Sequence, residues 1–330
     1  MKAYVKNIAY YLPDRVEENT NERLLLKTGI ERRHIAGVDE VASDMSVKVA
    51  EKLFKTVSRD SIDYLLFCTQ SPDYYLPTTA CILQNRLKLS KHIGALDYDY
   101  GCSGYIYGLG LAKGLIESGQ AKNVLLLTAE TYSKYINPED NAALPLFGDA
   151  ATATLIEGRE SANEGIYAFE YGTDGAGFQN FIVPVGGARE RYQDVKLKII
   201  TDKYGNTRTN RNLYMNGAAI MEFALTVVPE TLKRILARAS LTRQDIDYYV
   251  FHQANNFMLK SLKKICKLEN LPYWNDIKDY GNTVSNSIPI ALCDMTRQTD
   301  SQKLHRVMLI GFGVGLSWGG CIVDLSNFGE

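Results

Sequence analysis

Cys102 has the sequence surroundings of a catalytic nucleophile. It follows a strand-like stretch, residues 94–98, and precedes a glycine-rich stretch, residues 103–118, that is predicted to be a helix. The N-terminus of a helix offers free N–H groups and the positive end of the helix dipole, which stabilise a thiolate and then an oxyanion. Most lone cysteines are inert apolar side chains, but Gly101 and Gly104 beside Cys102 favour a reactive one. We therefore expect Cys102 to form a covalent intermediate.

His252 and Asn282 are the side chains expected to work with this cysteine. His252 ends a predicted strand, residues 248–252, and precedes a predicted helix. Open α/β sheets place their ligands at such carboxyl ends of strands. Asn282 lies in the turn Gly281-Asn282-Thr283, where asparagine is otherwise common because it suits turns. What singles it out is its place in an internal repeat.

The repeat consists of three pairs of segments that match in the same order at nearly the same offset. Residues 61–68 resemble residues 245–252, and residues 124–127 resemble residues 307–310. Between these pairs, residues 101–104 and 281–284 occupy equivalent positions in the two units. Pseudo-twofold packing of two such units should bring Cys102 and Asn282 together at the centre. The repeat predicts an N-terminal half, residues 1–165, with the nucleophile, and a C-terminal half, residues 166–330, with the histidine and asparagine.

The elements that must position these residues alternate between strands and helices, which favours an α/β fold with mixed or parallel sheets. Short apolar runs read as buried strands at 64–68, 124–129, 248–252 and 307–310. Helices are predicted at 44–57, 103–118, 217–238 and 256–267. The glycines of 103–118 cost helix stability, so we expect close approach of neighbouring elements along it. Residues 186–216 are polar and read as an insertion or hairpin.

Composition excludes several classes of protein. The chain has 330 residues, 45% of them apolar, and a formal net charge of -1, so no overall charge attracts nucleic acid or an anionic membrane. No apolar run approaches the roughly 20 residues of a membrane helix. Six scattered cysteines without a CxxC pair, and only four histidines, argue against a zinc site or a disulfide framework. The N-terminus lacks an apolar signal segment, and we expect a cytoplasmic protein.

At its carboxyl end the chain carries Gly311-Phe312-Gly313-Val314-Gly315. Too little sequence follows for a dinucleotide-binding unit, so we expect a close-packed loop that supplies a backbone N–H to the site. Together with Gly101-Cys102-Ser103-Gly104, His252-Gln253-Ala254-Asn255 and Gly281-Asn282-Thr283, this segment makes the chain resemble the β-ketoacyl-acyl-carrier-protein synthase III family. The likeness runs along the whole chain in the right order.

The resemblance implies the thiolase fold, with duplicated halves in five α-β-α-β-α layers, a homodimer, and a Cys-His-Asn site at the bottom of a tunnel. It implies that Cys102 takes an acyl group from a thioester, with the oxyanion held by the N–H groups of Cys102 and Val314. His252 and Asn282 would stabilise the enolate formed when a malonyl thioester loses CO2. Leu76, Phe312 and Gly313 would line the tunnel. No metal or redox cofactor is implied; acyl carrier protein, or coenzyme A, would carry the substrates.

The chain departs from the family pattern at positions outside the catalytic three. Lys27 and Asp140 stand at or near positions where phosphate-binding arginines are expected, Phe257 replaces a carrier-docking arginine, and Leu76 replaces a gatekeeping aromatic residue. Instead, Lys260, Lys263, Lys264 and Lys267 recur at helical spacing after His252. We therefore expect an acidic carrier protein to dock on Lys260, Lys263 and Lys264, although such a stripe is more often only a solvated helix face.

Three other readings stay open on the sequence alone. A family member could transfer the acyl group to an alcohol or amine without condensation, which Asn282 argues against. A papain-like hydrolase shares the chain order Cys, His, Asn, but the internal repeat and the glycines around Cys102 argue against it. A catalytically silent partner subunit would not require the intact three residues.

Overall fold

The computed structural model describes residues 1–329, and its larger sheet has five strands in the order β1-β7-β6-β4-β5. β4 pairs in parallel with β5 and β6, whereas β7 is antiparallel to β6 and β1. The strands are β1 (Lys2–Tyr11), β4 (Tyr64–Cys68), β5 (Gly94–Tyr98), β6 (Asn123–Glu130) and β7 (Ala150–Arg159). β5 forms one edge of this sheet.

The smaller sheet has four strands in the order β13-β14-β15-β8. β13 and β14 are parallel, and β15 is antiparallel to both β14 and β8. The strands are β8 (Ile166–Thr173), β13 (Tyr248–Phe251), β14 (Val307–Gly313) and β15 (Ser317–Val323). Beyond β13, Tyr273 forms a single parallel bridge with Tyr249, at the place that β5 occupies in the larger sheet.

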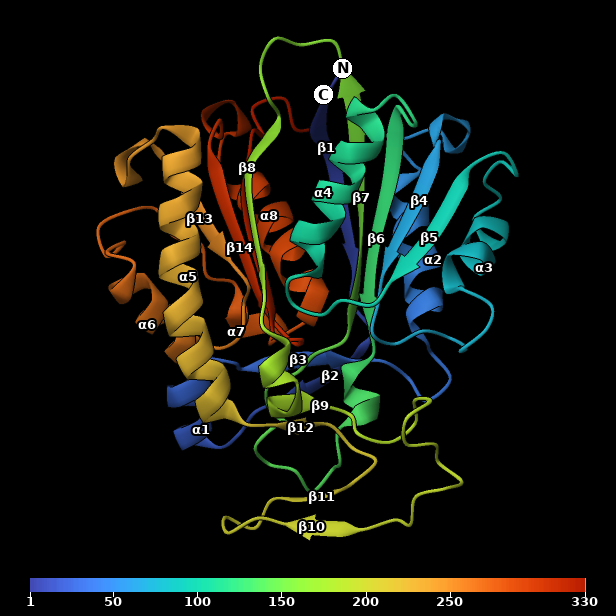
Figure 1. Ribbon diagram of the computed structural model, residues 1–330, viewed down its shortest axis with the longest axis vertical. Helices are drawn as coiled ribbons and strands as arrows, with labels where there is room; N and C mark the ends of the chain where they lie inside the picture. Colours follow the sequence, from blue (N-terminus) through green and yellow to red (C-terminus); the bar gives the residue numbers. More distant parts are fainter. Residues whose placement is uncertain (330) are drawn as a thin grey trace.

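Helices separate and cover the two sheets, which gives five layers (Figure 1). α4 (Gly104–Glu117) and α8 (Ser287–Gln298) lie between the sheets and contact strands of both. α2 (Ala42–Leu53) and α3 (Thr79–Arg86) cover the outer face of the larger sheet. α5 (Gly217–Ala239) covers the smaller sheet, with α6 (Asn256–Ile265) packed against it. The five-layered α/β arrangement that the resemblance implied is confirmed.

Shorter elements gather at one end of the molecule (Figure 1). They are α1 (Glu22–Thr28), α7 (Ile277–Tyr280) and the strand pairs β2 (Arg15–Glu18) with β3 (Arg32–Ile35), β9 (Phe181–Ile182) with β12 (Tyr214–Met215), and β10 (Ile199–Thr201) with β11 (Thr207–Thr209). β10 and β11 form an exposed hairpin within residues 186–216, as predicted. α1 packs on α6 and β3 on α7, so residues before 36 also cover the second half of the chain.

Within residues 1–329 there are also six 3-10 helices: η1 (Arg59–Ser61), η2 (Tyr132–Tyr135), η3 (Gly175–Asn180), η4 (Arg243–Asp245), η5 (Val284–Asn286) and η6 (Ser301–Lys303). η1 precedes β4, and η4 precedes β13 in the same way. Tyr64 pairs with Val124, and Tyr248 pairs with Val307, so the two parallel strand pairs share one register. These matching registers confirm the internal repeat.

Apolar side chains form three clusters: one on the outer face of each sheet, and one in the central layer that serves both of its interfaces. One lies between α2, α3 and the larger sheet, a second lies between the two sheets around α4 and α8, and a third lies under α5 and α6. At roughly 25 cal/mol per Å² of buried apolar surface, such burial supplies most of the stabilisation of a fold this size. No helix within residues 1–329 is both long enough and apolar enough to cross a membrane.

Three boundaries differ from the prediction. α2 begins at Ala42 and ends at Leu53, so it lies earlier than 44–57. α6 ends at Ile265, which leaves Lys267 outside the helix with a left-handed backbone. Gly311–Gly313 were expected in a loop but continue β14, because the glycines allow the strand to run close to Cys102.

Candidate active site

The turn between β5 and α4 presents Cys102. The Gly104 N–H donates to the Gly101 carbonyl at 2.8 Å, which folds the chain just before the first turn of α4. A Cβ on Gly101 would lie 2.6 Å from the Gln70 side-chain oxygen, and one on Gly104 would lie 2.4 Å from the Cys68 sulfur. Only glycine fits these two positions, and Cys102 is left 3% exposed next to the N-terminus of α4.

β14 runs directly behind the nucleophile. A Cβ on Gly311 would lie 2.7 Å from the Cys102 carbonyl oxygen, and one on Gly313 would lie 2.9 Å from Cys102 Cβ and 3.0 Å from its sulfur. Any side chain at either position would push the strand away from Cys102. The glycines at the end of β14 therefore bring the carboxyl-terminal half of the chain into van der Waals contact with the nucleophile.

His252 follows β13, and Ser287 fixes its ring. The His252 N–H donates to the Ile310 carbonyl at 2.9 Å, and its Nδ1 lies 2.7 Å from the Ser287 hydroxyl oxygen. That oxygen accepts the Gln253 N–H at 3.3 Å, so its own hydrogen is free to point at Nδ1. This arrangement favours the tautomer in which Nδ1 accepts and Nε2 carries the proton. Burial lowers the pKa of His252 to about 3, which keeps the ring neutral at physiological pH.

Asn282 is held by its backbone and by its own amide. Its N–H donates to the Leu146 carbonyl at 2.8 Å, and its carbonyl accepts the Gly148 N–H at 3.0 Å. Gly281 has φ +66°, which allows the turn into this position. The side-chain oxygen of Asn282 accepts the Val284 N–H at 2.9 Å. The amide NH2 is therefore the part of the side chain left to donate into the site.

These three side chains share one small cavity of about 60 Å³. Its walls are Cys102, Leu146, Phe147, Phe181, Met215, Gly217, Ile220, His252, Ala254, Asn255, Met258, Asn282, Phe312 and Gly313. The juxtaposition of Cys102 and Asn282 predicted from the repeat is thus present. Nδ1 of His252 faces Ser287, so its Nε2–H and the NH2 of Asn282 are the two donors available to one bound oxygen atom.

The other residues predicted for the tunnel and the oxyanion hole lie in different places. Phe312 and Gly313 line the cavity, whereas Leu76 lies outside it with 86% of its surface exposed. Val314 lines a second cavity of about 540 Å³, and Phe181 belongs to the walls of both. Within residues 1–329, neither the Cys102 N–H nor the Val314 N–H donates to another backbone group. Both donors therefore stay available to a substrate oxygen.

Burial and a buried acid disfavour the thiolate of Cys102. Burial raises the pKa of its thiol well above the ordinary value, and the carboxylate of Glu130 adds to the increase. The N-terminus of α4 acts in the opposite direction. These effects favour the thiol form of Cys102 over the thiolate. Sequence reasoning missed Ser287 and Glu130, because neither lies in a recognisable motif.

The predicted docking lysines lie on α6, one turn beyond the cavity residues Asn255 and Met258. Lys260 and Lys264 are exposed, whereas Lys263 is half-buried with its nitrogen 5.7 Å from the centre of the Tyr273 ring. Phe257 is 53% exposed at the start of the same helix. Lys267 lies past the end of α6, so the stripe contains three lysines rather than four.

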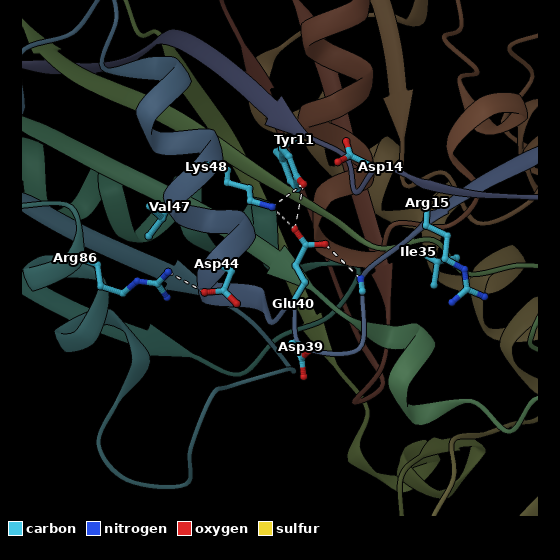
Figure 2. A pocket seen from close by; sticks show the side chains of 11 residues that line it. Tyr11, Asp14, Arg15, Ile35, Asp39, Glu40, Asp44, Val47, Lys48 and Arg86 are labelled. Atoms are coloured by element: carbon cyan, nitrogen blue, oxygen red, sulfur yellow. Dashed lines mark hydrogen bonds and ion pairs between the residues drawn. The ribbon is translucent and has the colours of Figure 1, made fainter.

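Another hollow, of about 710 Å³, lies beside α2, and its lining shares no residue with the cavity around Cys102 (Figure 2). Its charges neutralise one another: Lys48 binds Glu40 at 2.6 Å, and Arg86 binds Asp44 at 2.7 Å. A groove whose cations are already paired offers little to a charged substrate. The small buried cavity around Cys102 is therefore the better candidate for catalysis.

Comparisons with known proteins agree with this geometry. Residues 96–175 match the family model 3-oxoacyl-[acyl-carrier-protein (ACP)] synthase III, and residues 236–325 match the model for its C-terminal part. The chain is 35% identical to a putative 3-oxoacyl-[acyl-carrier-protein] synthase 3 of Campylobacter jejuni, over 93% of this chain and 86% of the relative. It is 34% identical to a β-ketoacyl-[acyl-carrier-protein] synthase III of Clostridioides difficile, over 98% of both chains.

Solved structures extend the likeness to three dimensions. A crystal structure of a 3-oxoacyl-(acyl-carrier-protein) synthase III matches with a TM-score of 0.95 and 45% identity, over 98% of this chain and 100% of the other. A 3-oxoacyl-(acyl-carrier protein) synthase from Burkholderia xenovorans matches with a TM-score of 0.89 and 34% identity, over 100% of this chain and 95% of the other. Motifs, fold and full-length identity agree, and the chain belongs to the β-ketoacyl-[acyl-carrier-protein] synthase III family of thiolase-fold condensing enzymes.

Proposed function

We propose that the chain joins an acyl group to a malonyl unit through an acyl-Cys102 intermediate. In the first step the Cys102 sulfur attacks the carbonyl carbon of an acyl thioester. The donor's C–S bond breaks, and the proton of Cys102 leaves with the released thiol. The oxyanion that forms on the way accepts hydrogen bonds from the N–H groups of Cys102 and Val314. The acyl group then remains on Cys102 as a thioester.

In the second step a malonyl thioester binds with its thioester oxygen between His252 and Asn282. Its carboxylate leaves as CO2, and the bonding electrons move into an enolate whose oxygen accepts from Nε2–H of His252 and from the Asn282 amide. The enolate carbon attacks the acyl carbonyl, the new carbon–carbon bond forms, and Cys102 leaves as the thiolate, which regains a proton from water. Neutral donors fit this role, because an enolate oxygen needs hydrogen bonds rather than a base.

The observation that carries the proposal is the shared buried cavity of Cys102, His252 and Asn282. The two donors available to one oxygen favour condensation over transfer to an alcohol or amine, since simple transfer needs no enolate. A hydrolase is disfavoured because the cavity is small and lined mostly by apolar side chains, and because the low pKa of His252 makes it a weak base for activating water.

Intact-mass measurement after incubation with a panel of acyl thioesters tests the first step. The protein should gain one acyl group, and Cys102→Ala should gain none. Cys68→Ala and Cys293→Ala serve as matched controls, because both cysteines are buried but lie outside the catalytic cavity. Acyl label retained on Cys102→Ala would refute the nucleophile assignment. Release of CO2 from malonyl thioester, followed by detection of the β-ketoacyl product, separates condensation from simple acyl transfer.

The carrier and the assembly belong to the same proposal. The exposed Lys260 and Lys264, with Lys263, support docking of an acidic carrier protein beside the cavity. The exposed edge of β5, with Leu96 42% exposed on it, supports a homodimer that pairs two larger sheets. Leu76 lies outside its own cavity, so a role in a substrate tunnel would require it to reach the cavity of a second copy.

A further inference from the structure

Glu130 is a buried carboxylate that the proposed mechanism does not use. It is the last residue of β6, and its side chain has no solvent exposure. It accepts hydrogen bonds from the Gln70 N–H at 3.1 Å and from the hydroxyls of Ser71 and Ser285, each at 3.1 Å. No cation within residues 1–329 forms an ion pair with it. A carboxylate buried among neutral donors lowers stability, so a compensating role is expected.

The contact with Ser285 connects Glu130 to the segment that carries the catalytic amide. Ser285 lies in η5, between Asn282 and Ser287. Thr128, two residues before Glu130 on the same face of β6, donates to the Asn286 side-chain oxygen at 2.6 Å. Two side chains of β6 thus hold η5 in place. Asn282 lies just before η5 in the sequence, and Ser287 follows it directly.

The remaining contacts connect Glu130 to the nucleophile. Gln70 and Ser71 follow β4, and a Cβ on Gly101 would lie 2.6 Å from the Gln70 side-chain oxygen. The loop that carries Cys102 is therefore packed against the same residues that Glu130 holds. We propose that Glu130 is a positioning residue whose carboxylate fixes η5, and with it Asn282 and Ser287, relative to the loop that carries Cys102. The inference rests on the proposed function, for which this relative placement matters.

The carboxyl group of Glu130 has a second, separable effect on the nucleophile. In its ionised form it raises the pKa of Cys102, whereas burial raises the pKa of Glu130 itself well above its ordinary value and its three hydrogen-bond donors oppose that increase. The other titratable side chains that face Glu130 are Cys68, Tyr98, Asp99, Tyr132 and Tyr135. Of these, Asp99 is exposed to solvent. Glu130→Gln therefore removes a buried carboxyl group near the nucleophile while keeping its size, and it reports whether that group is ionised.

Two variants and two readouts separate position from charge. Glu130→Gln removes the carboxyl group and keeps its size, and Ser285→Ala removes the hydrogen bond to η5 and keeps the carboxyl group. The first readout is the alkylation rate of Cys102 by iodoacetamide at fixed pH, in which the thiolate displaces iodide, with the site identified by mass spectrometry. The second readout is the release of CO2 from malonyl-coenzyme A. Ser71→Ala is the matched control, because it removes a hydrogen bond to Glu130 on the side away from η5.

We expect different responses. Ser285→Ala should lower CO2 release about tenfold and leave alkylation within about twofold, since one buried hydrogen bond to η5 is lost. Glu130→Gln should also lower CO2 release, because its NH2 group cannot accept one of the hydrogen bonds that the carboxyl group accepts, and it should speed alkylation by about threefold or more if the carboxyl group is ionised. Ser71→Ala should change neither by more than about twofold. A parallel fall of both rates in Ser285→Ala, or no fall in either, would overturn the positioning role.

An unchanged alkylation rate in Glu130→Gln would overturn the charge effect. If Glu130→Gln does not fold, Ser285→Ala still decides the positioning role, because it deletes only one hydroxyl. Failure of the proposed function has a different signature: the unaltered protein itself would release no CO2. The alkylation measurements, which need no thioester, would then still report on the charge of Glu130.

Discussion

Ser287 contacts no substrate in the proposed mechanism, yet its hydroxyl beside Nδ1 favours the tautomer of His252 with the proton on Nε2. Ser287→Ala removes the donor that faces Nδ1 and lets the ring take the tautomer with the proton on Nδ1. We expect CO2 release from a malonyl thioester to fall by about tenfold, as it does when one oxyanion donor is weakened. Acylation of Cys102 should change by less than about twofold, because that step does not use His252 as a donor.

Ser287→Thr keeps the hydroxyl and should retain more activity than Ser287→Ala. Ser261→Ala is a suitable control, because the hydroxyl of Ser261 donates to a backbone carbonyl within its own helix, α6. Equal losses in both half-reactions for Ser287→Ala would show that Ser287 supports the fold rather than the tautomer.

The low pKa of His252 also makes a prediction for stability. An unfolded histidine takes up a proton near its ordinary pKa of 6.5, whereas in the folded protein His252 stays neutral down to about 3. Between these values the unfolded state binds more protons, so the free energy of unfolding should fall as the pH is lowered from about 6.5 towards 3. Above 6.5 this contribution should be constant.

Denaturant titrations at a series of pH values, compared between the unaltered protein and His252→Gln, isolate this effect. The variant should lose a smaller part of its stability across that window. Identical pH dependence in the two proteins would mean that His252 is more accessible to protons than its burial indicates.

At the scale of elements, α6 offers a test of carrier docking. Lys260→Glu with Lys264→Glu reverses two exposed charges one turn beyond the cavity. The KM for a carrier-protein thioester should rise by about tenfold, while small thioester mimics should be used as before, because exposed charges steer an acidic partner but not a small substrate. The preference should weaken in salt, which screens charges over about 10 Å at 0.1 M.

Lys55→Glu is the control for this pair, because Lys55 is exposed just after α2 on the other sheet. Coenzyme A thioesters used as well as carrier thioesters, at every salt concentration and in both variants, would contradict docking on α6.

The glycines of α4 give a second prediction for an element. Close approach explains Gly108, whose Cβ would lie 2.2 Å from the Tyr98 hydroxyl and 2.8 Å from Leu126. It does not explain Gly114, which has nothing within 4 Å of a Cβ, so the expectation of close packing along the whole helix is wrong there. Gly114→Ala should therefore raise the free energy of unfolding by about 0.5–1 kcal/mol.

Gly108→Ala should instead destabilise the protein, because its methyl group would collide with the larger sheet. Denaturant unfolding of the two variants shows whether each substitution raises or lowers the free energy of unfolding. A loss of stability in Gly114→Ala would indicate that an interface between copies needs the space at this position.

Across the whole molecule, the sequence predicted the structural features that repeat within the chain and those that depend on neighbouring residues. The matching segments around β4 and β13 predicted two related halves. Their expected packing predicted that Cys102 and Asn282 lie close together. Side chains whose roles depend on contacts far apart in the chain had no such signal: Glu130 and Ser285 are 155 residues apart and share no motif. The position of Leu76 outside its own cavity has the same cause, since exposure depends on the assembled fold and not on the residue type.

The assembly can be tested at this scale. Leu96→Glu places a charge on the exposed edge of β5, where we propose that two copies pair. The unaltered protein should sediment as a dimer and the variant as a monomer with an unchanged circular dichroism spectrum, because a charge on an edge strand blocks pairing. Leu26→Glu, at a leucine on α1 that is 85% exposed against 42% for Leu96, should remain a dimer. A monomeric unaltered protein would exclude the homodimer.

A protein made of two related halves has a hazard that an ordinary fold lacks. If both sheets ended in an open strand, each copy could add another copy at both ends, and the result would be a fibre. In the larger sheet, β5 is a full edge strand. Its counterpart in the second half is reduced to the one bridge of Tyr273 with Tyr249, next to Pro272, whose ring nitrogen cannot donate to a further strand. The loss of one strand from one repeat would therefore limit the pairing that we propose for β5 to two copies.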